Sequence, residues 1–391
     1  MKISDILLLF IITIFISCDS DTLDSKEITS INVNLTDEIK YLGCSKVLNL
    51  KKAINLETAQ NCLIGDIDDI IVNDTLLYIL DKEITKSIFV FNYKGSFIKK
   101  IASQGKGPTE YISLSSIVYD KWANKLLVLD GIGKKLLIYS SLGDYVREIK
   151  LCDCFDSFRV LDEENLIFYS NFYSLSNKQF TICSKNGKVV KRFEKIPKQQ
   201  NSIGYSHDIF CKNGDTCLFA MPFDSNIYSI SNNERELYAS FSFNGNFIHP
   251  KAKELSKENL EKLFYNNDVQ GRIINAIKHL MLVDDILYFS VVFQHHEYSV
   301  FCDISTSKII EWGQLISDVD HLFLGNSHPI GQTSQELIFA IEPYKEIERY
   351  KRLKSKKEYL LGLNKYRDLF ENSKLHDGSN PSLLMFSIKN N

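Results

Sequence analysis

Short apolar runs recur along the chain in pairs, and a few polar residues separate the two members of each pair. The first runs are TLLYILD (75–81), KLLVLD (125–130), NLIFYS (165–170), CLFAM (217–221), ILYFS (286–290) and ELIFAI (336–341). Their partners are SIFVFN (87–92), KLLIYS (135–140), QFTICS (179–184), NIYSIS (226–231), EYSVFC (297–302) and SLLMFS (382–387). Aromatic and β-branched residues dominate both sets, and the lengths suit strands. The first runs are apolar at nearly every position, which predicts strands that are buried on both faces.

Further extended segments flank these pairs. Glycine-containing turns follow the first three partner runs and lead to FIKKIA, YVREIK and KVVKRF. Another short strand precedes the first runs, as in DDIIV (68–72), SSIVY (115–119) and HDIFC (207–211). The chain therefore carries six units of four strands, most of them about 40–50 residues apart. This pattern predicts an all-β fold, a six-bladed β-propeller of four-stranded antiparallel blades.

The two ends of the chain complement each other in this scheme. The last partner run, SLLMFS, is followed only by IKNN, so the sixth blade lacks its outer strand. Near the other end, KVLNL (46–50) has no blade of its own. We predict that this N-terminal strand completes the last blade and closes the ring, which removes an exposed sheet edge.

Two segments interrupt the strand pattern within a propeller domain expected at residues 44–391. Residues 252–281 and 345–372 carry apolar residues at roughly helical spacing. Both are predicted to be helical insertions packed on the propeller. The second insertion is rich in lysine and arginine. It either contacts an acidic partner or is simply solvated.

The N-terminus has the features of an export signal. A run from Ile6 to Ile16, in which only Thr13 is not apolar, follows Lys2 and is too short to span a bilayer comfortably. It ends in Ser17-Cys18, which resembles the lipobox of bacterial lipoproteins, where the cysteine is lipidated. We expect a signal peptide at 1–17, lipidation at Cys18 and a flexible acidic tether over 18–43. The alternative is an ordinary signal peptide. The expected location is the cell envelope, with a lipid anchor in the outer membrane of a Gram-negative cell.

Composition narrows the classes of partner. A formal net charge of −3 and 44% hydrophobic residues predict a well-buried globular body and argue against a general nucleic-acid binder. The cysteines lack the paired spacing of structural zinc sites.

The stretch SQGKGPTEY (103–111) predicts a tight turn between the first two blades. Gly105 and Gly107 permit a positive φ, Pro108 fixes its own φ, and Glu110 can accept hydrogen bonds from backbone amides. A phosphate-binding P-loop needs GxxxxGK[ST] at the start of a helix, and neither the spacing nor the helix is present.

The same residues carry a family resemblance. Gly105, Gly107, Pro108, Glu110 and Tyr111 resemble the GxGPGEY signature of bacterial lipoproteins described as six-bladed β-propellers and related to NHL-repeat propellers. Thr109 replaces the usual glycine of that signature. Asn380-Pro381-Ser382-Leu383 resembles the NPxL ending of the same group. The resemblance implies the propeller fold and an envelope location, but it implies no activity and no catalytic residue.

Propellers commonly bind ligands at the axial mouth, where connecting loops converge, so acids and histidines there are candidate ligand contacts. These residues are Asp66, Asp68, Asp69, His207, Asp208, His279 and His321. Our first interpretation is a binding module for a peptide, a glycan or a partner protein, with no required cofactor, because no catalytic set is recognisable. The alternative is a metal-dependent hydrolase or lactonase that uses calcium or zinc in the same mouth. Fold alone does not choose between them.

Overall fold

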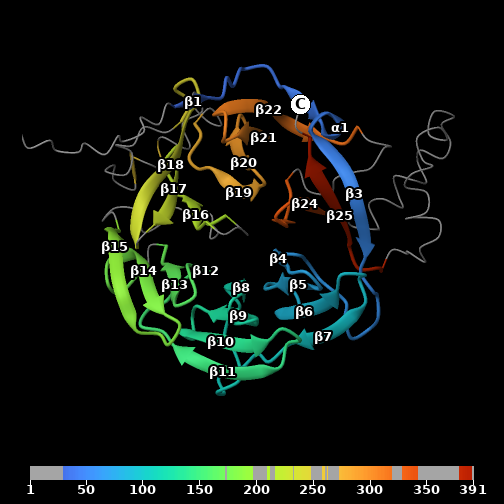
Figure 1. Cartoon of the computed structure of the whole chain (residues 1–391), viewed down its shortest axis with the longest axis vertical. Coiled ribbons are helices and arrows are strands. Elements are labelled where there is room, and N and C mark those ends of the chain that lie inside the picture. Colours follow the sequence, from blue (N-terminus) through green and yellow to red (C-terminus); the bar gives the residue numbers. More distant parts are fainter. Residues whose placement is uncertain are drawn as a thin grey trace, which may run out of the picture.

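Six antiparallel sheets stand in a ring around one axis (Figure 1). The structure is a computed structural model, and it describes residues 30–171, 174–196, 209–211, 216–231, 233–247, 258–259, 262, 273–318, 328–341 and 378–389. The predicted six-bladed, all-β propeller is confirmed.

The first three blades follow one another without interruption, and each has four strands. Blade one contains β4 (Asp69–Val72), β5 (Leu76–Asp81), β6 (Ser87–Asn92) and β7 (Phe97–Ile101). Blade two contains β8 (Ser116–Asp120), β9 (Lys125–Asp130), β10 (Lys135–Ser140) and β11 (Tyr145–Lys150). Blade three contains β12 (Ser157–Val160), β13 (Asn165–Tyr169), β14 (Lys178–Ser184) and β15 (Val189–Lys195).

The other three blades recruit segments from near the N-terminus. Blade four contains β16 (Leu218–Ala220), β17 (Asn226–Ser231) and β18 (Glu234–Ser242), and a bridge from Phe210 to Phe219 adds residues 209–211 on its inner side. Blade five contains β19 (Lys278–Val283), β20 (Ile286–Phe293), β21 (His296–Asp303) and β22 (Lys308–Ile316). Blade six contains β23 (Gly331–Gln332), β24 (Leu337–Ile341), β25 (Ser382–Ile388) and β3 (Leu48–Asn55).

The second strand of each blade is buried on both faces, as its unbroken apolar sequence predicts. In β5 all six residues are buried. Leu77 and Ile79 pack toward blade six, whereas Tyr78 and Leu80 pack toward blade two. Each of the six hydrophobic clusters joins two neighbouring blades, and the cluster that contains Leu77 reaches Leu383 of blade six. The core is therefore a closed ring of inter-blade contacts.

The ring closes by pairing the two ends of the chain. The strand β3 runs antiparallel to β25, with Ala53 opposite Leu384 and Leu48 opposite Ile388 (Figure 1). The Lys389 amide also donates to the Val47 carbonyl at 2.8 Å. The predicted completion of blade six by an N-terminal strand is confirmed.

Asn380, two residues before the start of β25, fastens this closure to the segment that leads into blade one. Its side-chain amide donates to the carbonyls of Glu57 and Cys62, both at 2.7 Å, and its side-chain oxygen accepts from the Ile64 amide at 2.9 Å. The Asn380 backbone amide donates to Thr58 Oγ1 at 2.9 Å. Because Asn380 is 2% exposed, water cannot replace these partners. The asparagine of the NPxL ending thus has a structural role.

The segment before β3 differs from the predicted tether. Residues 18–43 were expected to be flexible, but β1 (Ile31–Asn32) and β2 (Tyr41–Gly43) add parallel outer strands to blades four and five. A short helix, α1 (Cys44–Val47), then leads into β3. Lys40 and Lys46 both form ion pairs with Glu311 of β22. The alternation of Ile31, Val33 and Leu35 with two asparagines indicates a strand with one buried face, a signal that the prediction missed, whereas β2 is too short to show a pattern.

The predicted insertions lie largely outside the described residues. Of 252–281, residues 258–259 and 262 are helical, and 278–281 belong to β19 rather than to an insertion. The insertion predicted at 345–372, the signal peptide and Cys18 are all outside the described residues. No helix in the described part of the chain is both long and apolar enough to cross a membrane.

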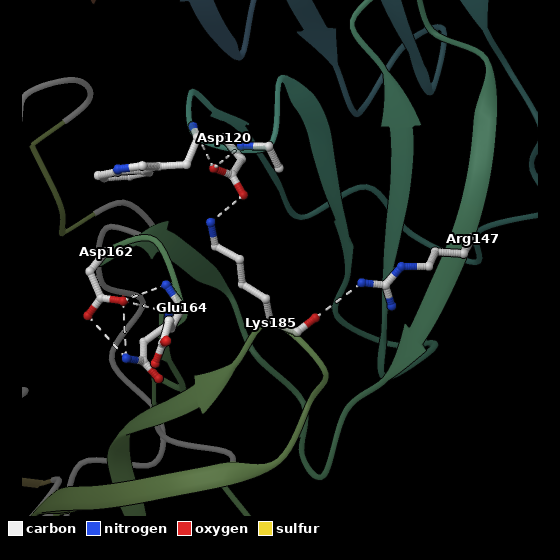
Figure 2. A network of polar contacts seen from close by, with 8 residues as sticks. Asp120, Arg147, Asp162, Glu164 and Lys185 are labelled. Atoms are coloured by element: carbon white, nitrogen blue, oxygen red, sulfur yellow. Dashed lines mark hydrogen bonds and ion pairs between the residues drawn. The ribbon is translucent and has the colours of Figure 1, made fainter.

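An ion pair links blades two and three (Figure 2). Lys185, in the turn after β14, places its Nζ 2.6 Å from Asp120 Oδ2 at the end of β8. The Asp120 side chain is 1% exposed, and its other oxygen accepts from the amides of Trp122 and Ala123. The Lys185 carbonyl accepts from Arg147 of β11 (Figure 2). One turn of blade three is therefore held against two strands of blade two.

Replacing Asn380 by alanine is expected to destabilise the closed ring by about 2–4 kcal/mol, because the Cys62 carbonyl and the Ile64 amide lose their side-chain partner. Urea unfolding followed by circular dichroism measures this difference. Asn61→Ala, at an exposed position of the same segment, is the control and should stay within about 0.5 kcal/mol of the parent. Equal stabilities for the two variants would contradict the structural role of Asn380.

Replacing Lys185 by methionine is expected to lower the free energy of unfolding by about 1–3 kcal/mol, because the buried Asp120 carboxylate then lacks its counter-charge. Lys188→Met removes an exposed lysine from the same turn and should have almost no effect. Thermal unfolding of the two variants side by side measures the difference. A loss of equal size in both would show that the Lys185–Asp120 ion pair does not stabilise the protein.

Candidate functional site

One end of the propeller gathers the connections between blades. The chain enters each first strand at this end, and antiparallel pairing then brings the ends of the second strands and the starts of the third strands back to it. We call this the crossover end. It carries the GKGPTEY loop, the predicted aspartates of blade one and the start of β19.

In blades one and two, buried aspartates at the crossover end bind backbone amides. Asp81, the last residue of β5, accepts from the amides of Gly65, Asp66, Ile84 and Thr85. Asp130, the last residue of β9, accepts from the amides of Ile112, Ser113 and Gly133. Both side chains are completely buried. Their carboxylate oxygens are occupied by the turns that they stabilise, so they are structural residues.

The predicted aspartates of blade one also serve the backbone. Asp68 accepts from the Lys82 amide at 2.7 Å, and burial raises the pKa of its carboxyl group. The side chains of Asp66 and Asp69 each accept from the amide of the next residue. None of the three belongs to a cluster of potential metal ligands among the described residues.

The GKGPTEY loop is a turn held by its own hydrogen bonds. The Gly107 amide donates to Glu110 Oε2 at 2.8 Å, and the Gly105 amide donates to the Tyr111 carbonyl at 2.9 Å. Neither glycine has a positive φ. A Cβ on Gly105 would instead lie 2.0 Å from Glu110 Oε2, so the glycine allows the carboxylate to approach the backbone. The Tyr111 hydroxyl donates to the Lys86 carbonyl at 2.6 Å and closes the gap between blades one and two.

A cavity of about 360 Å³ lies beside this loop on blade two. Its charged lining residues are Lys106, Lys134, Lys135, Lys150 and Glu148. Lys135 is already engaged, because its Nζ donates to the Gly107 carbonyl and lies 3.4 Å from Glu148 Oε2. The cavity suits an anionic group, but half of its lining residues are lysines, and two of these, Lys106 and Lys150, are exposed.

Blade five has a different arrangement, in which one carboxylate faces two imidazoles. Glu297, near the start of β21, has Oε2 3.1 Å from His328 Nδ1 and Oε1 3.5 Å from His279 Nε2. The two imidazole rings stack with centroids 3.6 Å apart. His328 lies just before β23 of blade six, so the cluster spans the interface between blades five and six. The three side chains are 19–30% exposed and therefore accessible to solvent.

His279 reaches Glu297 because β19 contains a bulge. Lys278 lies opposite Ser290 and Met281 opposite Tyr288, so the two residues His279 and Leu280 stand opposite the single residue Phe289. His279 has a φ of 51°, a left-handed conformation that costs a non-glycine residue about 1–3 kcal/mol. Bulges redirect side chains and occur often beside functional sites. The strained backbone here directs an imidazole toward a carboxylate.

Glu297 is oriented and kept ionised by its neighbours. Burial alone would raise the pKa of Glu297, but hydrogen bonds from His328 and Ser290 and the charges of His328 and His279 outweigh burial and lower the pKa to about 2. The Ser290 hydroxyl donates to Glu297 Oε1 at 2.6 Å. The cluster therefore offers a fixed negative oxygen and two imidazole nitrogens, a set that can bind a cation or hydrogen-bond a polar ligand.

The sequence identified one member of this cluster. His279 was a candidate because it precedes a first run. His328 also precedes a first run, that of blade six, and could have been found by the same rule. Glu297 begins a partner run and was missed. His207, Asp208 and His321 lie outside the described residues.

Two solved structures of other proteins have a fold similar to this one. A crystal structure of a Bacteroides fragilis protein described as "Putative exported protein" superposes with a TM-score of 0.72 at 22% identity, over 93% of this chain and 100% of that one. A member of the DUF4221 family from Bacteroides vulgatus gives a TM-score of 0.52 at 11% identity, over 88% of this chain and 98% of that one. These likenesses support the fold alone. Comparison with curated proteins gives no match.

The profile of a domain of unknown function, DUF4934, matches residues 29–386. This match spans every blade, from the strand added to blade four through the closing strand β25. The chain belongs to the DUF4934 family.

Proposed function

We propose that this chain is a lipid-anchored envelope propeller that binds a peptide, glycan or partner protein at the crossover end of blades five and six. The observation that carries the proposal is the His279–Glu297–His328 cluster. Its side chains are partly exposed to solvent, and a strained bulge positions His279, whereas Asp81 and Asp130 of blades one and two are buried and occupied by backbone amides. A near-neutral charge supports partners other than nucleic acid.

A second candidate function is favoured by the same cluster. Two histidines and a carboxylate form the kind of set that holds a catalytic metal in hydrolases, where the metal activates water. This candidate needs a bound divalent cation and turnover of a hydrolysable substrate. Hydrolysis of γ-butyrolactone or p-nitrophenyl acetate by the parent, lost in His279→Ala, would favour it over pure binding.

The location of the site is tested by screening full-length protein in detergent against a bacterial glycan array and a displayed random 12-mer peptide library. The strongest hit should bind at least about tenfold more weakly, a loss of ~1.4 kcal/mol, when His279 and His328 are both alanine. Lys134→Ala with Lys150→Ala, on the cavity of blade two, is the matched control and should leave binding unchanged. Full binding by the double-histidine variant would overturn the placement of the site, and an absence of hits would count against the binding function.

The lipid anchor rests on the sequence before residue 19. Metabolic labelling with an alkyne fatty acid should mark the parent in a Gram-negative host and fail to mark Cys18→Ala. The unlabelled variant should also leave the membrane fraction, unless its uncleaved apolar segment retains it. Labelling of both proteins would place the lipid on another residue. Labelling of neither would remove the lipid anchor from the proposal.

A further inference from the structure

Three side chains from distant parts of the sequence place potential metal-ligand atoms together between blades five and six. One ligand atom each from His279, Glu297 and His328 lie within 4.8 Å of one another. No other group of three such residues occurs in the portion of the chain that the structure describes. Their spacing in the sequence carries no motif, so only the closed fold brings them together.

The distances match those between ligands of one tetrahedral ion. Two ligands bound at about 2.0–2.1 Å from a tetrahedral zinc ion lie about 3.3 Å from each other. The two nitrogen–oxygen distances to Glu297 are 3.5 Å from His279 Nε2 and 3.1 Å from His328 Nδ1. Each nitrogen thus lies near the required separation from one oxygen of Glu297, His279 from Oε1 and His328 from Oε2. Because the two imidazoles stack with their planes 14° apart, a shared cation requires one ring to turn toward it.

The surrounding residues hold the set in place. The bulge at His279 supplies one imidazole, and the hydrogen bond from Ser290 fixes one oxygen of Glu297. Outer contacts of this kind orient the ligands in metal sites.

We propose that His279, Glu297 and His328 form a site for a divalent transition cation of the zinc type. Two nitrogens and one oxygen are the donors that zinc prefers, whereas calcium and magnesium take mainly oxygen ligands. Three protein ligands leave a fourth position of zinc for water or for an oxygen or nitrogen of a bound molecule. The proposal deepens the function proposed above, since the cation would contact the ligand, but metal binding itself needs no such ligand.

The test uses untagged full-length protein in detergent, stripped with EDTA and dialysed, and titrated with zinc chloride in a calorimeter. We expect saturable binding of about one zinc ion per chain, and at least about tenfold weaker binding in His279→Ala, His328→Ala and Glu297→Gln. His295→Ala with His296→Ala removes two nearby histidines that are outside the cluster and should bind zinc as the parent does. Calcium chloride and magnesium chloride should give no saturable heat.

A second readout separates metal binding from a structural contact between blades. Zinc should raise the melting temperature of the parent and of the His295/His296 variant, but not that of Glu297→Gln, which keeps the shape of the side chain. Absence of zinc binding, zinc binding that survives all three cluster substitutions, or binding of calcium alone would overturn the site. Zinc binding without any glycan or peptide hit would leave the site standing and count only against the proposed ligand.

Discussion

The pairing of β3 with β25 is the constraint on which the rest of the structure depends. Without it, blade six would lack its outer strand and would present an open edge. The hydrophobic cluster between blades six and one would then lose the residues that β3 contributes. Asn380 extends the constraint beyond the ladder, because it binds the segment that enters blade one. The two ends of the propeller are therefore held by backbone pairing and by one buried side chain. A closed ring also fixes the angle between blades five and six, and the candidate site lies at that interface.

Most of the fold could be predicted because a strand that is buried on both faces of its sheet has an unbroken apolar sequence. An inner strand between two blades has no solvent side, so KLLVLD and SIFVFN read as strands at every position, and the structure begins and ends them at the predicted residues. The strands β1 and β2 left no such pattern. They consist of two and three residues that pair in parallel with β18 and β22, and only one face of each strand, with Ile31 and Leu42, enters the core. The glycines of the GKGPTEY loop were placed correctly in a turn, but their reason is the close approach of Glu110 rather than a positive φ.

The candidate site was less predictable because it depends on geometry that single residues do not reveal. His279 was identified from its position ahead of a first run, yet its direction comes from a two-residue bulge in β19. Glu297 begins a run that otherwise reads as buried, EYSVFC, and its neighbours His295 and His296 suggest only an exposed turn. Its partner His328 lies 31 residues further along the chain. The packing of blade six against blade five brings the third member of the cluster to the other two, and no pattern within either blade specifies that contact.

The contrast between blades explains why the crossover end offers a site in blade five rather than in blades one or two. At Asp81 and Asp130 the carboxylates accept from backbone amides, and any ligand that took their place would remove the acceptors that hold those turns. Glu297 instead faces two imidazoles and a hydroxyl, all of which are side chains. Side chains can rotate and find water or a new partner, so an incoming cation or polar group can replace their contacts without disturbing a turn. A carboxylate that accepts hydrogen bonds from backbone amides therefore has a structural role. A carboxylate whose donors are side chains is available to bind a ligand.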